Sequence, residues 1–151
     1  MTPEELSDRF EIRALIVRYA HALDTRHFEW LDEVLTPDAY LDYRATGGID
    51  GRWPQIRAWL PPAVGAFPRM CHLVGNIHIT LAAQRAQART LCLNPVEVPL
   101  PGGGQQVMLL GMWYRDQLVR SAAGWRMSER VQEGSIRHNV PAHLMIPAPA
   151  A

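Results

Sequence analysis

The spacing of apolar residues changes along this chain of 151 residues, and the change limits the folds it can adopt. Before Cys71, apolar side chains recur mainly at three- and four-residue spacing, which is typical of amphipathic helices. After Cys71 the chain reads mostly as long strands bounded by turn-prone residues. This order predicts an α+β fold, in which the helices pack on one face of a strongly bent, antiparallel or mixed sheet.

About three helices are expected in the N-terminal part. A T-x-x-E capping box at residues 2–5, with proline at the first helical position, predicts a helix from near Pro3 to about Asp24. A second, short helix is predicted over residues 27–35, and these two helices should form a hairpin. A third helix is predicted over residues 53–60, because the two prolines that follow should stop it.

Strands are expected in the rest of the chain. Residues 39–43 are predicted to form a short strand, and the TGGIDG stretch after it a turn. Longer strands, separated by turns such as PGGGQ, are predicted over residues 71–83, 86–98, 105–119 and 124–135. The proline-rich segment 138–151 is expected to be irregular and to lie over the body of a single domain that spans residues 1–151.

Composition argues against several partners and cofactors. The 15 basic and 15 acidic residues balance, so no net field draws the chain to nucleic acid or anionic lipid. No apolar run reaches the ~18 residues of a membrane span, and the acidic N-terminus is unlike a signal peptide, so a cytoplasmic protein is expected. Lysine is absent, which excludes Schiff-base chemistry and a lysine-anchored pyridoxal cofactor. Cys71 and Cys92 are expected to be buried as small apolar residues.

Three motifs carry a family resemblance that extends over nearly the whole chain. They are a YxxxxD that ends the first helix, the stretch LDEVLTPDAYLDY, and CHLVGN at the start of the long strands. With the order of elements, they resemble the SnoaL-like branch of the nuclear transport factor 2-like superfamily. Within that branch, the chain looks most like the group of scytalone dehydratase, bile-acid 7-alpha-dehydratase and hexachlorocyclohexane dehydrochlorinase. The resemblance implies a cone with a pocket between the helices and the curved sheet, and a homo-oligomer such as a dimer or trimer.

Asp24 and His72 fill the two positions of this group's shared signature, an aspartate that ends the first helix and a histidine on the first long strand. A carboxylate gains nothing from the helix dipole at a C-terminus, so another interaction should hold Asp24 there. A histidine can accept a proton near neutral pH, and a carboxylate on its other nitrogen fixes the tautomer and stabilises the imidazolium. The pair is therefore predicted to be a catalytic base and its orienter. The alternative is a solvated helix end and a core histidine.

The resemblance also implies three further polar residues. Tyr19 lies five residues before Asp24, where the bile-acid dehydratase carries a tyrosine and the dehydrochlorinase a lysine. Tyr43 matches a pocket tyrosine of scytalone dehydratase, and strand alternation favours it over Tyr40 as the pocket-facing residue. Arg130 falls at the place of a pocket arginine in the dehydrochlorinase, where it could stabilise developing negative charge. A core tyrosine and a surface ion pair are the alternatives for Tyr19 and Arg130.

A hydrophobic substrate pocket is predicted from the apolar residues of the same segments. Its candidate lining residues are Leu41, Met70, Leu109, Trp113 and Gln132. Such a pocket suits a flat, hydrophobic, cyclic substrate, although the apolar residues could equally be plain core. The second pocket histidine of scytalone dehydratase has no clear counterpart here, which puts any transfer of its substrate in doubt.

These features predict a small cofactor-independent lyase of the dehydratase or dehydrohalogenase type. An isomerase or cyclase with the same base is one alternative, and a non-catalytic ligand-binding or oxygenase-small-subunit-like protein is another. No metal site is expected, since His72 and His78 would lie ~20 Å apart along a strand.

Overall fold

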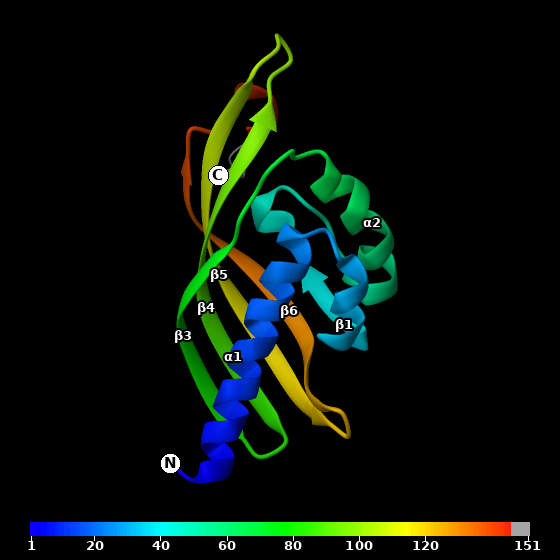
Figure 1. The fold of residues 1–151 in the computed structure, drawn as a ribbon, viewed down its shortest axis with the longest axis vertical. Coiled ribbons are helices and arrows are strands. Elements are labelled where there is room, and N and C mark those ends of the chain that lie inside the picture. Colours follow the sequence, from blue (N-terminus) through cyan, green and yellow to red (C-terminus); the bar gives the residue numbers. More distant parts are fainter. Residues whose placement is uncertain (146–151) are drawn as a thin grey trace, which may run out of the picture.

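Figure 1 shows the computed structural model, which describes residues 1–145, as a curved sheet with helices against one face. The helices pack on the concave face of a six-stranded sheet that does not close, which confirms the predicted α+β cone. None of the helices in the described part of the chain is long and apolar enough to cross a membrane.

Helix α1, Pro3–Asp24, begins at the predicted capping box. The Thr2 N–H donates to Glu5 Oε2 at 2.8 Å, and the Glu5 N–H donates to the Thr2 hydroxyl at 3.1 Å. The apolar stripe of the helix faces the sheet, where residues such as Ile16 are fully buried. The helix ends at Asp24, as predicted.

The prediction of a second helix over residues 27–35 is wrong in both the type and the length of the helix. Phe28–Glu33 form a short 3-10 helix, η1, and strand β1, Leu35–Asp42, begins before the Thr-Pro pair. Sheet pairing overrides the local helical pattern, because β1 runs parallel to β6 from the pair Leu35–Met127 onward. Pro37 is tolerated within β1 because it lies where this pairing shifts register and no ladder hydrogen bond depends on it.

Helix α2, Trp53–Gly65, continues past Pro61 and Pro62, so the prediction that it stops at residue 60 is wrong. A proline inside a helix removes a backbone hydrogen bond and costs about 3 kcal/mol. Leu60 and Val64 are nevertheless buried on the same helix face, and this tertiary packing holds the last turns in place.

The sheet has the strand order β2-β1-β6-β5-β4-β3 and is mixed, since β1 and β6 are parallel and the other neighbours antiparallel. The four long strands form where they are predicted, and PGGGQ lies at the turn between β4 and β5. Register shifts between β5 and β6 bend the sheet locally. The remaining strands are β2 Asp50–Arg52, β3 Leu73–Ala82, β4 Arg85–Pro99, β5 Gln105–Ser121 and β6 Gly124–His138.

Alternation along β4 and β5 decides which side chains reach the concave face. Even-numbered residues such as Cys92 and Met112 are buried there, and odd-numbered residues face outward. Cys92 is therefore buried, as predicted. Cys71 is exposed just before β3, so the prediction of a second buried thiol is wrong.

The described part of the predicted tail packs on the body of the domain. Strand β6 continues to His138 and Ala142–Leu144 form a 3-10 turn, η3, so the expectation of no regular structure is wrong here. Val140 and Leu144 pack against an apolar cluster at the ends of β4 and β5, as expected for a segment that covers the body. The rest of the predicted tail, residues 146–151, lies outside the described residues.

Candidate active site

Asp24 and His72 are in direct contact, although 48 residues separate them in the chain. Asp24 ends α1 and His72 stands immediately before β3 rather than within it. Asp24 Oδ1 lies 2.6 Å from His72 Nδ1, and Asp24 Oδ2 accepts the His72 backbone N–H at 2.9 Å. Because the carboxylate contacts both the ring and the backbone of His72, it fixes the orientation of the imidazole. These bonds also offset the unfavourable position of Asp24 at a helix C-terminus.

The contact determines which nitrogen of His72 can act as a base. A carboxylate only accepts hydrogen bonds, so Nδ1 carries the hydrogen and Nε2 keeps its lone pair. The His72 side chain is only 4% exposed, against 22% for Asp24. Nε2 therefore lies in a site that is largely closed to bulk water.

Asn94, in the middle of β4, donates a hydrogen bond to His72 Nε2 and was not predicted from the sequence. Its amide nitrogen lies 3.2 Å from His72 Nε2, and the Asn94 side chain is buried. Its amide oxygen has no hydrogen-bond partner among the described residues. The signal that could have found it is a polar residue at a buried, even-numbered position of β4, where apolar residues are the rule.

A cavity of about 250 Å³ opens beside His72 between α2, the loop after β1 and strands β4 to β6. Its polar lining residues are Tyr43, Thr46, His72, Asn94 and Gln132. The rest of the lining is apolar apart from two glycines, and comprises Leu23, Trp59, Leu60, Ala63, Val64, Phe67, Met70, Val96, Met108, Leu110 and Met112. A mostly apolar cavity with a few convergent polar groups is typical of a small-molecule site.

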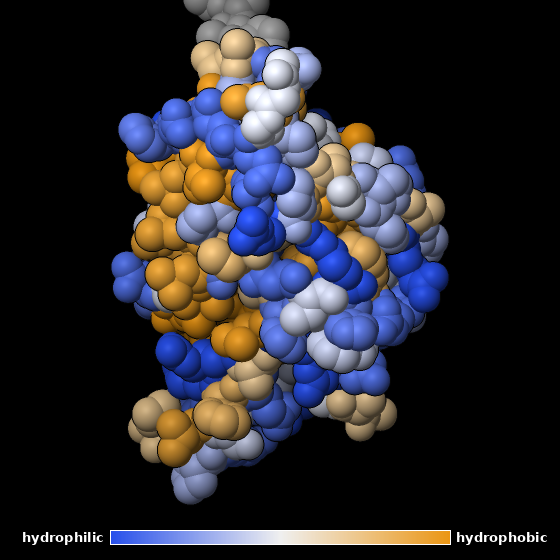
Figure 2. Space-filling view, turned by 45° about the horizontal axis from the view of Figure 1, so that its top comes forward, coloured by the Kyte–Doolittle hydropathy of each residue, from blue (hydrophilic) through white to orange (hydrophobic). Residues whose placement is uncertain are grey.

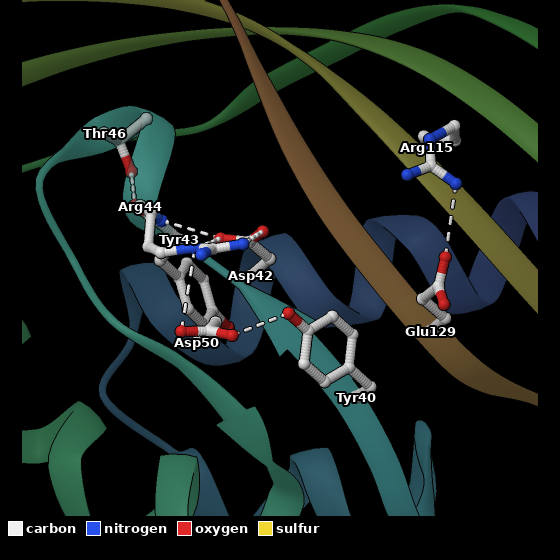
Figure 3. Close-up of polar contacts among 8 residues, drawn as sticks. All are labelled: Tyr40, Asp42, Tyr43, Arg44, Thr46, Asp50, Arg115 and Glu129. Atoms are coloured by element: carbon white, nitrogen blue, oxygen red, sulfur yellow. Dashed lines mark hydrogen bonds and ion pairs between the residues drawn. The ribbon is translucent and has the colours of Figure 1, made fainter. Parts of the chain in front are cut away.

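The loop after β1 is held in place by ion pairs outside the cavity. Arg44 donates to both carboxylate oxygens of Asp42, at 3.0 and 2.7 Å, and lies 3.6 Å from Asp50, which also accepts the Tyr40 hydroxyl at 2.7 Å (Figure 3). The bond from Arg44 lowers the pKa of Asp42, so this carboxylate stays charged. Tyr40 thus contributes to the loop anchor, while its neighbour Tyr43 lines the cavity.

Glycine is required at one point of this loop. A Cβ on Gly48 would lie 2.7 Å from Cβ of Tyr43 and 2.8 Å from Cη2 of Trp59, closer than packed carbon atoms approach. The loop also brings the Thr46 hydroxyl to Gln132, whose Oε1 accepts it at 2.5 Å. The close packing at Gly48 and the hydrogen bond from Thr46 to Gln132 together fix the position of this loop, which forms one wall of the cavity.

Behind Tyr43 lies a buried chain of polar groups. The Tyr43 hydroxyl contacts the Tyr19 hydroxyl, and the ring centre of Tyr19 lies 4.1 Å from the guanidinium carbon of Arg130. Arg130 forms two hydrogen bonds, of 2.8 and 2.7 Å, to Asp116. Burial raises the pKa of both Tyr19 and Tyr43, and the positive charge of Arg130 opposes that rise. Both phenols therefore carry their protons at neutral pH.

Comparisons with known proteins agree with this architecture. A family model for the SnoaL-like domain matches residues 4–131. The chain belongs to the SnoaL-like family. An uncharacterized protein of Mycobacterium tuberculosis is 48% identical over 128 residues, which cover 85% of this chain and 86% of the relative.

Solved structures share the fold of this SnoaL-like chain at low sequence identity. A scytalone dehydratase-like protein of Novosphingobium aromaticivorans matches with a TM-score of 0.81 at 19% identity, covering 100% of this chain and 99% of that one. A hexachlorocyclohexane dehydrochlorinase of Novosphingobium barchaimii matches with a TM-score of 0.78 at 17% identity, covering 95% and 97%. These likenesses show that the chain shares its overall fold with both structures.

Several predicted site residues of this SnoaL-like domain do meet in space. His72, Tyr43, Met70 and Gln132 line the cavity, and Asp24 lies directly behind His72. The described residues contain no group of three or more His, Cys, Asp or Glu side chains that could hold a metal ion.

Other predicted residues lie away from the cavity of the SnoaL-like domain. Leu109 and Trp113 are on the outer face of β5, where Arg89 covers the Trp113 ring at 5.0 Å, so their prediction as lining residues is wrong. Leu41 is fully buried in the core. Tyr19 and Arg130 are buried one layer behind the cavity wall, so neither touches the cavity directly.

Proposed function

We propose that this chain is a small, cofactor-independent lyase of the dehydratase type. The observation that carries the proposal is the His72 imidazole, which lines a mostly apolar cavity while Asp24 holds Nδ1 and the Asn94 amide contacts Nε2. The shared fold of a scytalone dehydratase-like protein and of a dehydrochlorinase supports a reaction of this class.

His72 would act on a carbon next to a carbonyl group of the substrate. The substrate first displaces the Asn94 N–H from Nε2. The carbon–hydrogen bond then breaks, the proton passes to His72 Nε2, and the electron pair forms an enolate. The bond to the β-hydroxyl then breaks, and the leaving oxygen takes the proton from His72. The products are an α,β-unsaturated ketone and water, and His72 returns to its starting state.

The cavity favours a substrate that is hydrophobic, cyclic and uncharged. No Arg, Asp or Glu is among the described residues that line it, and its walls are mostly apolar. A cavity of about 250 Å³ exceeds the roughly 150 Å³ that holds one benzene ring, and lies below the usual range for drug-sized ligands.

The unpartnered amide oxygen of Asn94 favours loss of water over loss of halide. A buried acceptor without a donor is costly, so a ligand that donates a hydrogen bond there gains affinity. A hydroxyl leaving group carries such a donor and a halide does not. We therefore place the leaving hydroxyl of the substrate beside Asn94 and His72.

A screen over cyclic β-hydroxyketones tests the proposed function. We expect enone absorbance to appear together with a product lighter by one water, in the presence of a chelator and after dialysis. A product of unchanged mass would support an isomerase or cyclase instead. Tight binding without turnover, or a co-purifying oxygenase-like partner, would support the non-catalytic alternatives.

Asn94→Leu should lower kcat/KM for the hydroxyketone found in this screen. Loss of one hydrogen bond to a buried group costs roughly 1–3 kcal/mol, which corresponds to roughly a 5- to 150-fold loss. Thr90→Val is the matched control, because Thr90 is also a buried polar residue of β4 whose hydroxyl has no hydrogen-bond partner within residues 1–145, but it does not line the cavity. Equal effects of the two substitutions would remove Asn94 from the proposed mechanism.

We also propose that the chain forms a homo-oligomer through the outer face of the sheet. Leu73, Leu93, Gly111 and Ile136 lie side by side across four strands, and Leu73 and Ile136 are 68% and 53% exposed. Figure 2 shows hydrophobic surface on the side of the molecule where β3 lies. Packing of this row of residues against a second copy of the chain would remove apolar surface area from water.

Leu73→Asp combined with Ile136→Asp should convert the oligomer to a monomer, as measured by light scattering at micromolar concentration. Two buried charges without partners would oppose association. Phe10→Asp is the control, because Phe10 is 74% exposed on α1, away from this face. A wild-type chain that is already monomeric would contradict the proposal.

A further inference from the structure

The Arg130–Asp116 ion pair lies deep in the domain, where it is costly to maintain. Arg130 is 1% exposed and Asp116 is fully buried. Apolar residues of similar volume often replace a buried ion pair without loss of stability, so stability alone gives little reason to keep one. The pair does not line the cavity, and the mechanism above does not use it.

The guanidinium is tightly confined by what surrounds it. Its carbon lies 4.1 Å from the ring centre of Tyr19 and 4.0 Å from that of Tyr114, so it is held between two aromatic faces. Asp116 binds its Nε and one terminal nitrogen, and the other terminal nitrogen, Nη1, has no partner among the described residues. The group therefore has one fixed position directly behind Tyr19.

A continuous path leads from this charge to the cavity. Tyr19 contacts Arg130 through its ring and Tyr43 through its hydroxyl, and Tyr43 lines the cavity. For Tyr43 to donate its hydrogen to a ligand, its oxygen must accept the hydrogen of Tyr19. Hydrogen bonds in such a chain polarise one another, and more strongly where water is excluded.

We propose that Arg130 is a positioning residue that acts through Tyr19 to make Tyr43 a donor to a substrate oxygen that becomes negative. This inference rests on the proposed function, in which removal of a proton by His72 leaves an enolate. The enolate oxygen accepts the Tyr43 hydrogen, Tyr43 accepts that of Tyr19, and the guanidinium stabilises the added electron density behind Tyr19. No proton leaves the two phenols, so charge and atoms balance within the elimination step.

The binding of 4-nitrophenol tests this inference without a substrate, because the ionisation of this probe is visible as a colour change. The measurement is made in the His72→Gln background, so that no catalytic base can take the phenol proton. We expect the bound probe to ionise at lower pH than the free probe, because the Tyr43 donor stabilises the phenolate.

Tyr19→Phe keeps the ring on Arg130 and removes the hydroxyl, and it should weaken the preference for phenolate over phenol by roughly tenfold. The double replacement Arg130→Met with Asp116→Leu should have a similar effect. Tyr114→Phe, which keeps the other ring and removes a hydroxyl outside the path, should leave the preference unchanged. If the double replacement does not fold, Tyr19→Phe decides the question alone.

The inference is overturned if all variants keep the same preference for phenolate over phenol. It is also overturned if a substitution weakens the binding of phenol and of phenolate by the same factor. The proposed function fails separately, through absence of turnover in the hydroxyketone screen. Turnover that depends on His72 but not on Tyr19 would contradict this inference and leave the proposed function in place.

Discussion

His72→Gln should lower kcat/KM for the hydroxyketone by at least the ~10²- to 10⁴-fold typical of a positioned general base. Glutamine is polar and of similar length, so the fold should stay intact, but it cannot take a proton from carbon. The rate is followed as enone absorbance, and far-ultraviolet circular dichroism checks the fold. His78→Gln is the matched control, because His78 is an exposed histidine on β3 and lies close to His72 in the sequence.

Asp24→Asn should lower kcat/KM for the hydroxyketone by a comparable factor, for a different reason. Its amide can donate to His72 Nδ1, which would place the hydrogen on Nε2 and leave that nitrogen without the lone pair that takes the substrate proton. In the proposed mechanism base and orienter act as one unit, so the double variant should be scarcely slower than His72→Gln alone. Independent, multiplicative losses would show that the two residues do not work together.

Asp116→Ala should reduce the free energy of unfolding by about 3–5 kcal/mol, because it leaves the Arg130 guanidinium buried without its carboxylate. The double replacement Arg130→Met with Asp116→Leu should restore most of this loss, since no uncompensated charge then remains. Urea unfolding, followed by tryptophan fluorescence, measures both variants.

The neighbouring pair Arg115–Glu129 supplies a control within the same two strands. It joins β5 and β6 at 3.2 Å over the same sequence separation, but it lies on the outer face and is partly exposed (Figure 3). Glu129→Ala should therefore cost no more than about 1 kcal/mol. If Asp116→Ala and Glu129→Ala lowered the free energy of unfolding by the same amount, this would contradict the expectation that the buried Arg130–Asp116 pair is the costlier one to break.

The sequence alone predicted the elements whose signals are local. The capping box at residues 2–5 and the apolar stripe after it set the limits of α1, and therefore the position of Asp24. Alternating residues and turn signals predicted the long strands of the sheet. The match of Asp24 and His72 to a family signature brought together two residues that lie far apart in the chain, and in the structure they are in contact.

Tertiary structure decided the features that depend on partners distant in sequence. Pairing with β6 made Leu35, the last residue of the predicted second helix, the first residue of a strand, and packing of Val64 carried α2 past two prolines. Leu109, Leu110, Met112 and Trp113 are all apolar, so their order along β5 does not reveal which face is concave. Pairing with β4 places Leu110 and Met112 inside and the other two outside.

The same physical reason accounts for Asn94 and Arg130. A strand pattern states which residues share a face, but the depth of each residue depends on what covers that face. Helix α1 covers Arg130 with Tyr19, whereas the cavity beneath α2 leaves Asn94 beside His72. Sequence thus predicted most of the elements and the pairing of Asp24 with His72, and the packing of helices on a curved sheet determined which polar side chains reach the cavity.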